Sequence, residues 1–371
     1  MNKQKIALGA VTAAALMMLA ASAQASQSYH NLRGEAKLDS SSATPLIIAG
    51  NLPDSPSNRI DPNLTTSPWA GVVSINIRYE GSSFICSGSM ISAVHVLTAA
   101  HCVDTTDFGN VIDITKPGNN VRVIFNTQAS AGADNTFTLA TATSVAMHPD
   151  YKGFGPCPPG VAGFCLNDDL AILTLPAASV PSWVPTYSLG YMDNSAPQTM
   201  VGFGTSGTGT TGGTVNPSFF VKRVGANYSD LFDLDDEQNF DGGSLEVWQS
   251  DFDGNGIDTH CDLFSVCSPI LANNVETSLG GGDSGGPSFQ QVAGQWLVVG
   301  NNTYGTRFFG SQVSSTFGTG SGGMIVAAYL PWISKATDGA VTVVPEPGTY
   351  ALMGLGLLAV CAAARRRRTE V

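Results

Sequence analysis

Charged side chains are scarce in this sequence: they make up 12% of its 371 residues, whereas glycine alone occurs 42 times. Long exposed helices and coiled coils are rich in charged residues, so the composition argues against a long-helix architecture and is typical of secreted β-proteins. Basic residues are fewest, with 17 Lys and Arg against 29 Asp and Glu. No basic patch is visible, which excludes the usual nucleic-acid binders.

The N-terminal segment has the order of features found in secretory signal peptides. Lys3 and Lys5 are followed by an apolar run over 6–21 and by a small-x-small cleavage site that ends at Ala25. This order predicts an exported protein whose signal peptide, residues 1–25, is removed by signal peptidase.

The C-terminal segment 345–371 has three parts: Pro-Glu-Pro at 345–347, an apolar run over 349–364 and four arginines at 365–368. The run is short for a membrane span, and the arginines fit the positive-inside rule. The segment resembles the PEP-CTERM sorting signal of Gram-negative bacteria, which a membrane exosortase processes. We expect an extracellular or cell-envelope protein that this transmembrane segment anchors transiently. A plain C-terminal membrane anchor is the alternative.

Removing the six basic and two acidic residues of the two signals leaves 11 basic and 27 acidic residues. Six cysteines remain in the body of the chain, and none lies in a CxxC metal motif. Because disulfides persist in oxidising compartments, their close spacing favours three local bridges, although six cysteines allow fifteen pairings. The favoured pairs are Cys86–Cys102, Cys157–Cys165 and Cys261–Cys267.

Residues 26–59 are polar and lack periodicity, which indicates a propeptide or flexible segment. From Trp69 onward the sequence has runs of apolar and β-branched residues typical of strands. We expect strands at 72–78, 84–91, 121–126, 136–147 and 170–175.

Three polar residues stand out among these strands. Ser284 lies in a Gly-Gly-Asp-Ser-Gly-Gly-Pro stretch, where glycines permit a tight bend that aims backbone N–H groups at one point. His101 lies directly beside Cys102, whose disulfide would hold the imidazole in one orientation. Asp169 adjoins an apolar strand, where a buried carboxylate needs a cationic or imidazole partner. A surface turn, a buried structural histidine and a solvent-exposed strand start are the alternatives.

These residues lie in segments that resemble the signatures of chymotrypsin-like (trypsin-fold) serine proteases. The matching segments are TAAHC at 98–102, DLAIL at 169–173, GDSGGP at 282–287, CSGS at 86–89, GFG at 202–204, Thr303-Tyr304-Gly305 and the helix start at 329–333. The resemblance implies an all-β fold of two six-stranded antiparallel β-barrels with a short C-terminal helix. The protease domain would span 60–336, with a linker at 337–344, the first barrel ending near Pro181 and an insertion over 230–258.

The resemblance also implies the chemistry of a serine-type endopeptidase. Ser284 would be the nucleophile, His101 the general base and Asp169 the residue that orients the imidazole. The N–H groups of Gly282 and Ser284 would form the oxyanion hole. We expect polypeptide substrates, no required cofactor and a monomer.

Substrate-binding residues follow from the same resemblance: Ser278, Thr303, Tyr304 and Gly305. Ser278 occupies the base of the specificity pocket, where trypsin-like preference for Lys or Arg needs an aspartate. A neutral base suits an apolar or aromatic residue. Gly280 replaces the cysteine whose disulfide usually braces this pocket, so the resemblance does not predict the shape of the pocket.

Activation in the family inserts a new N-terminal Ile or Val against the aspartate before the nucleophile, here Asp283. Cleavage at Arg59-Ile60 is our hypothesis because a basic residue precedes an isoleucine. Ile47–Gly50 looks more like the usual mature start, but no basic residue precedes it.

A possible calcium loop begins at Asp251, with Asp253, Asn255 and Asp262 at its third, fifth and twelfth positions. Alternating oxygen ligands with a glycine at the sixth position suit Ca²⁺ as a structural ion. An acidic surface insertion is the alternative. Two further functions stay open for the chain: a catalytically silent surface-display or matrix-binding protein, and an esterase.

Overall fold

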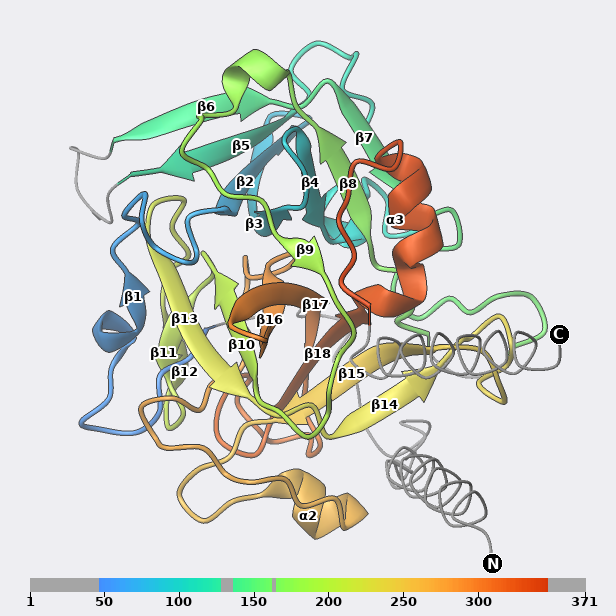
Figure 1. The fold of residues 1–371 in the computed structure, drawn as a ribbon. Helices are drawn as coiled ribbons and strands as arrows, with labels where there is room; N and C mark the ends of the chain where they lie inside the picture. The colour runs from blue at the N-terminus through green and yellow to red at the C-terminus, as the bar shows by residue number, and fades with distance from the viewer. Residues whose placement is uncertain (1–46, 128–135, 162–164, 346–371) are drawn as a thin grey trace, which may run out of the picture. The chain divides into compact units, whose positions relative to one another are not determined.

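The computed structural model describes residues 47–127, 136–161 and 165–345. Of these residues, all except residue 345 belong to one structural unit, which spans 30–344. Its strands form two large, mainly antiparallel sheets, the first from strands within 72–174 and the second from residues 60–61 and strands within 188–325 (Figure 1). Within these residues no helix is long and apolar enough to cross a membrane. The predicted signal peptide and the apolar C-terminal run lie outside the described residues.

The first sheet has seven strands in the order β6-β5-β2-β3-β4-β8-β7. They are β2 (Val72–Tyr79), β3 (Ser82–Met90), β4 (His95–Thr98), β5 (Asn120–Asn126), β6 (Phe137–Thr141), β7 (Ser144–Met147) and β8 (Ala171–Thr174). Alternate residues of β2, namely Val73, Ile75 and Ile77, enter one core cluster with residues of the other strands. This is the period of two that a sheet with one inward face requires.

The second sheet has nine strands, of which eight follow the order β1-β13-β10-β16-β17-β18-β15-β14 and β9 pairs in parallel with β17. They are β1 (Ile60–Asp61), β9 (Ser188–Leu189), β10 (Gln198–Gly202), β13 (Lys222–Asn227), β14 (Leu231–Leu234), β15 (Leu245–Asp251), β16 (Pro287–Val292), β17 (Gln295–Thr306) and β18 (Gly320–Ile325). A separate hairpin pairs β11 (Ser206–Thr208) with β12 (Gly212–Val215).

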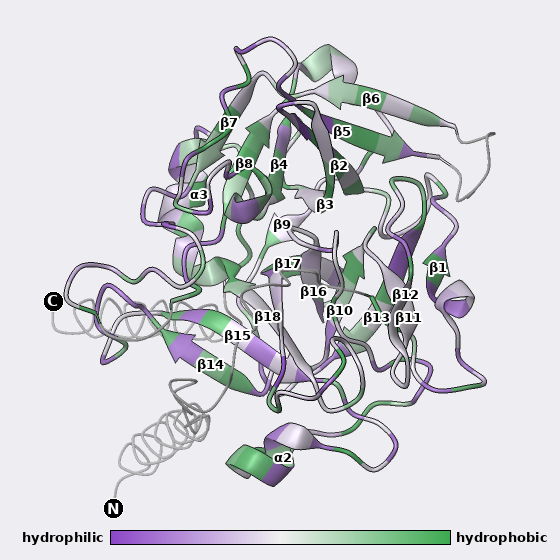
Figure 2. Cartoon of the chain, turned by 180° about the vertical axis from the view of Figure 1, so that it is seen from behind, coloured by the Kyte–Doolittle hydropathy of each residue, from purple (hydrophilic) through white to green (hydrophobic). Residues whose placement is uncertain are grey.

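The strand-rich architecture with a short C-terminal helix agrees with the expected two-barrel class, but each sheet holds more than six strands. Part of the excess is the 230–258 segment, which we expected to be an insertion. Its strands β14 and β15 instead join the second sheet through β18. Val247 and Trp248 are fully buried there because the apolar residues of this acidic segment face the core. Figure 2 shows hydrophilic stretches within β13 and β15.

A second apolar cluster joins the two sheets. Leu97 of β4 and Ile172 of β8 pack in it with Val201 of β10, Phe289 of β16 and Val298 of β17. Strand β8 is therefore buried on both faces, since Leu173 points into the first sheet's own core. Burial on both faces explains its continuous apolar run.

Short helices connect and close the sheets. They are η1 (Pro56–Arg59), η2 (Ala100–Cys102), η3 (Ala177–Ser179), α2 (Thr259–Phe264), η4 (Val326–Tyr329) and α3 (Leu330–Ala336). Helix α3 lies beside β7 in Figure 1, and its Trp332 ring meets the ring of His148, which follows β7, edge to face at 5.0 Å.

Candidate active site

His101 and Asp169 form the central contact of the candidate site. His101 lies in η2 directly after β4, and Asp169 lies just before β8, which pairs with β4. The His101 Nδ1–H donates to Asp169 Oδ2 at 2.8 Å, and the His101 backbone N–H donates to Asp169 Oδ1 at 2.8 Å. Both oxygens of this fully buried carboxylate therefore hold one histidine, through its ring and through its backbone.

Two further contacts limit the motion of the His101 ring. The Cys86–Cys102 disulfide ties η2 to β3, and the other two expected disulfides, Cys157–Cys165 and Cys261–Cys267, are also present. The ring of Phe154 lies 5.2 Å from the imidazole, centroid to centroid. The sequence analysis did not identify Phe154, because an aromatic residue in a loop has no distinguishing local pattern.

The neighbouring Asp168 takes a different partner. Its backbone is left-handed, with φ of 65°, so its side chain leaves the chain in another direction from that of Asp169. The Asp168 carboxylate lies 3.1 Å from His148 Nδ1, and its backbone N–H donates to the Tyr329 hydroxyl. The prediction that Asp169 is the fully buried carboxylate agrees with this geometry.

Ser284 lies in a bend that the first sheet holds in place. The Ser87 N–H donates to the Ser284 carbonyl at 2.8 Å, and the Ser87 hydroxyl donates to the Gly282 carbonyl at 2.7 Å. A Cβ on Gly285 would approach Thr98 Oγ1 to 2.1 Å, so only glycine fits beside the strand that leads to His101. Ser87 thus positions the bend, a role that its place in the CSGS segment had not revealed.

His101 and Ser284 line one cavity of about 910 Å³, together with Gly282 and residues of the β2–β3 hairpin. Within the described residues, the imidazole makes its ring hydrogen bond to Asp169 and none to the Ser284 hydroxyl. Such bonds are often long in unliganded sites and tighten when substrate binds. The N–H groups of Gly282 and Ser284 donate to no acceptor in the described part of the chain, which leaves both available to a ligand.

Asp283 is fully buried beneath this bend. Its carboxylate accepts hydrogen bonds from the N–H groups of Gly204 at 2.8 Å and Gly280 at 3.1 Å. Burial raises the pKa of Asp283 to about 7, although the Gly204 N–H, the charge of Arg223 and the Ile47 backbone N–H favour its ionised form. A cation in direct contact with this carboxylate would therefore favour its ionised form more strongly than these groups do.

The start of the folded domain differs from the sequence-based prediction. Residues 47–59, assigned to a propeptide, pack into the second sheet, and Ile47 and Ile48 are at most 1% exposed. Ile47, rather than Ile60, meets Asp283. Ile60 belongs to β1 and is 37% exposed. The hypothesis of activation at Arg59-Ile60 is therefore not supported by the positions of these residues.

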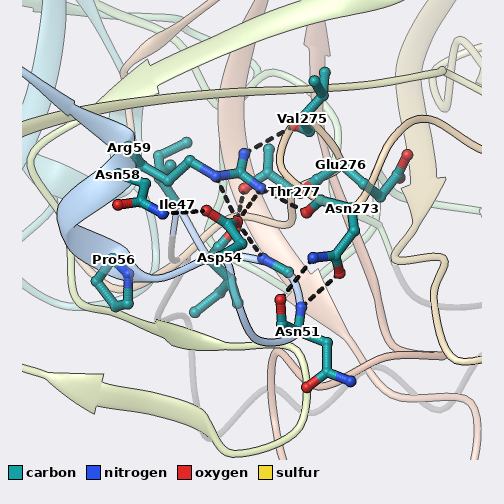
Figure 3. A network of polar contacts seen from close by, with 12 residues as sticks. Ile47, Asn51, Asp54, Pro56, Asn58, Arg59, Asn273, Val275, Glu276 and Thr277 are labelled. Carbon is teal, nitrogen blue, oxygen red and sulfur yellow. Dashed lines mark hydrogen bonds and ion pairs between the residues drawn. The ribbon is translucent and has the colours of Figure 1, made fainter.

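Arg59 is itself inaccessible to a processing enzyme (Figure 3). Its guanidinium forms a buried ion pair with Asp54 at 2.7 Å. It also donates to the backbone carbonyls of Asn273, Val275 and Glu276. A basic residue before an isoleucine was a misleading signal, because this arginine is a structural cross-link between the N-terminal segment and the 273–276 loop.

None of the four expected substrate-binding residues is among the residues that line the described cavity. Ser278 is 1% exposed and Tyr304 3%, and the hydroxyls of both are buried without a hydrogen-bond partner in the described part of the chain. A Cβ on Gly322 would approach the Tyr304 hydroxyl to 2.4 Å. Thr303 and Gly305 lie beside Tyr304 in β17. Their contact with substrate stays a prediction.

The four expected calcium ligands separate into two groups. Asp251 and Asp253 are buried and lie with Asp258 in a group whose carboxylate oxygens are within 4.8 Å of one another. Asp262 is instead exposed on α2 and is not part of that group. The Asn255 Oδ1 accepts a hydrogen bond from the Asn51 side chain.

A buried acidic hairpin lies behind Asp168. Burial is the main reason that the pKa of Glu246 is raised to about 9, while its hydrogen bond from Asn167 acts in the opposite direction. Because the unfolded chain loses this proton near the ordinary value of 4.5, the folded state binds the extra proton between these limits. The free energy of unfolding therefore falls as pH rises through that window.

We expect Glu246→Gln to flatten this pH dependence, since the amide keeps an acceptor for Asn167 and cannot ionise. Urea unfolding at about pH 6 and about pH 9 measures the slope. Glu80→Gln, at an exposed site, serves as the control and is expected to keep it. An unchanged slope in Glu246→Gln would show that other groups cause the loss of stability.

Two sheets, a His-Asp pair and a serine that lines the same cavity as the histidine are the arrangement expected of a two-barrel serine hydrolase. Comparison with known families agrees: residues 60–222 match the Trypsin family model, and residues 343–368 match that of the PEP-CTERM protein-sorting motif. The chain is thus similar to the Trypsin family over residues 60–222 and to the sorting motif over 343–368, which confirms both resemblances. The Trypsin match includes His101 and Asp169 and ends before Ser284.

Two curated proteins are similar to the chain over most of its length. One is CLIP domain-containing serine protease B15 of Anopheles gambiae, 24% identical in an alignment of 287 residues that covers 72% of this chain and 65% of that protein. The other is brachyurin of Leptuca pugilator, 26% identical in an alignment of 261 residues that covers 68% of this chain and 88% of that protein. The chain thus spans just under two thirds of the first relative.

Proposed function

We propose that the protein is an exported serine endopeptidase that hydrolyses peptide bonds through an acyl-enzyme intermediate. The observation that carries this proposal is the geometry around one cavity. His101 is fixed by both oxygens of Asp169, and Ser284 lines the same cavity. The backbone N–H groups of Gly282 and Ser284 donate to no acceptor in the described part of the chain. A protein that only displays or binds has no need of all these groups together.

The reaction follows from this geometry. The Ser284 hydroxyl attacks the scissile carbonyl carbon while His101 Nε2 takes its proton, and Asp169 stabilises the imidazolium that results. The carbonyl oxygen becomes an oxyanion that the N–H groups of Gly282 and Ser284 bind, a contribution of about 3 kcal/mol per donor. The C–N bond then breaks as His101 gives the proton to the leaving amine. Water, activated by His101, attacks the acyl-enzyme and releases the acid and Ser284.

The test uses purified protein that begins at Ile47 and ends at Val344. A fluorophosphonate probe should label it covalently, and a mixed peptide library should be cleaved within its sequences and reveal what the specificity pocket prefers. Labelling together with hydrolysis of simple esters but no peptides would favour the esterase alternative. Neither labelling nor cleavage by fully processed protein would favour the silent display protein.

Processing before Ile47 is part of this proposal. The Ile47 backbone N–H already meets the buried Asp283 carboxylate. Cleavage of the 46–47 bond would convert this amide into an ammonium, a stronger partner for the carboxylate that would order the bend carrying Ser284. We expect N-terminal sequencing of active protein to begin at Ile47.

Asp283→Asn tests this role of the N-terminus, because it removes the charge that the ammonium needs. We expect kcat/KM to fall at least about 100-fold, the equivalent of about 2.7 kcal/mol, with the fold retained by circular dichroism. Active protein that begins at Ile60, or full activity of the asparagine variant, would contradict it.

The sorting motif at 343–368 supports export and surface display in a Gram-negative bacterium. We propose that signal peptidase and an exosortase-type enzyme process the two ends. The substrates would then be polypeptides at or beyond the cell envelope.

A further inference from the structure

A second cluster of acidic groups lies at the end of β15, away from the residues that line the described cavity. Asp251 ends this strand, and Asp253 and Asp258 follow in the turn that leads to α2. Their carboxylate oxygens lie within 4.8 Å of one another. The turn is held at its C-terminal end, since Asp258 Oδ1 accepts from the Cys261 N–H and Cys261 is bridged to Cys267.

The Asp253 carboxylate has an oxygen without a protein partner. Asp253 is only 4% exposed, and its Oδ1 atom is buried without a hydrogen bond in the described part of the chain. An unpaired buried carboxylate oxygen costs on the order of 1–3 kcal/mol or more. A cation that this oxygen coordinates would remove the cost.

The cluster also has more negative charge than its surroundings compensate. His260 faces Asp230 at 3.0 Å and Asp251 at 3.5 Å, and one imidazolium offsets at most one carboxylate.

We propose that Asp251, Asp253 and Asp258 bind a Ca²⁺ ion. Three carboxylates without a thiol ligand suit a hard cation, and backbone carbonyls and water complete such sites. His260 acts behind the ligands: its backbone N–H donates to Asp251 Oδ2 at 2.7 Å and its Nδ1 is occupied by Asp230. Groups of this kind orient ligating carboxylates. Asp262 is no ligand, so the site differs from the twelve-residue loop that the spacing suggested.

The ion would also stabilise the N-terminal segment. Phe252, between two of the ligands, packs with Ile48 and Phe317. The Ile48 N–H donates to the Ser278 carbonyl at 3.1 Å, and the Asn227 amide bridges the carbonyls of Asp251 and Thr277. Calcium is therefore expected to hold together the turn, the N-terminal segment at Ile48 and the segment that leads to Asp283. The link to activity rests on the proposed function, whereas binding does not.

The test measures binding and melting in the Ser284→Ala background, so that its outcome is independent of proteolysis. With Ca²⁺ at about 5 mM we expect Tm to rise by about 5 °C over protein in EGTA, and titration calorimetry to show one site with a Kd of about 0.1–1 mM. Mg²⁺, which demands stricter octahedral geometry, should give a smaller shift.

Two matched variants locate the site. Asp253→Asn removes one buried charge, so in EGTA it should melt at or above the parent temperature, while its Ca²⁺-dependent rise should fall by at least half. Asp262→Asn should keep the full rise. The proposal is overturned if the parent shows no rise and no binding heat, if Asp253→Asn keeps the full rise, or if Asp262→Asn loses it.

Discussion

Replacing Ser284 by alanine is expected to lower kcat by on the order of 10⁶-fold, the loss that follows removal of the nucleophile from such a triad. The remaining oxyanion N–H groups and substrate binding account for any residual rate. Fluorophosphonate labelling should disappear entirely, because Ser284 is the hydroxyl residue of the described cavity lining that belongs to the bend with the Gly282 and Ser284 N–H groups. Turnover of a peptide found in the library and gel detection of the probe measure both effects.

Stability should be unaffected, since the hydrogen bonds that hold the bend use the backbone of Ser284 and the side chain of Ser87. Ser244→Ala, at an exposed position in the β14–β15 hairpin, is the matched control and should keep full turnover and labelling. Labelling that survives in Ser284→Ala would place the nucleophile elsewhere and refute the proposed mechanism.

Replacing Asp169 by asparagine is expected to lower kcat by on the order of 10⁴-fold, with a much smaller effect on KM. Both carboxylate oxygens accept hydrogen bonds from His101, one from its backbone N–H and one from Nδ1–H. Asparagine offers only one acceptor, so its NH₂ group must face one of these donors. The imidazole then rotates or takes the tautomer protonated at Nε2, which cannot accept the Ser284 proton.

Asp168→Asn is the control for this prediction, because it changes the adjacent carboxylate without touching His101. Asp168 lies against His148, and its loss should lower stability modestly while kcat stays within a few-fold of the parent. NMR of the His101 ring nitrogens would distinguish the tautomers directly. Equal losses of kcat in the two variants would mean that the orienting role is not specific to Asp169.

Local pattern was sufficient for those parts of the site in which chemistry and conformation lie in one short segment. The glycines around Ser284, the cysteine beside His101 and the apolar run after Asp169 each combine a reactive group with its local support. The three disulfides could be predicted for the same reason, since their partners are 16, 8 and 6 residues apart. Strands β2, β3 and β5 lie near the ranges predicted from their apolar and β-branched residues, whereas the single run predicted over 136–147 is two strands, β6 and β7.

Local pattern failed where a residue's role depends on a distant partner. Arg59 has the local appearance of a cleavage site, but its ion pair with Asp54 and three carbonyls of the 273–276 region make it a buried cross-link. The acidic 230–258 segment was expected to be a surface insertion, and its pairing with β18 is a contact over some 75 residues of sequence. Ser87 and Phe154 act on the site only through such long-range contacts.

The sequence by itself indicated export, predicted a chain rich in strands and identified His101, Asp169 and Ser284, because composition and short motifs encode these properties directly. Only the tertiary structure decided that Ile47 rather than Ile60 meets Asp283, and that Asp258 rather than Asp262 joins Asp251 and Asp253. The physical reason is that burial and contacts between distant segments set the charge and hydrogen-bonding state of a carboxylate. Spacing along the chain is silent about both.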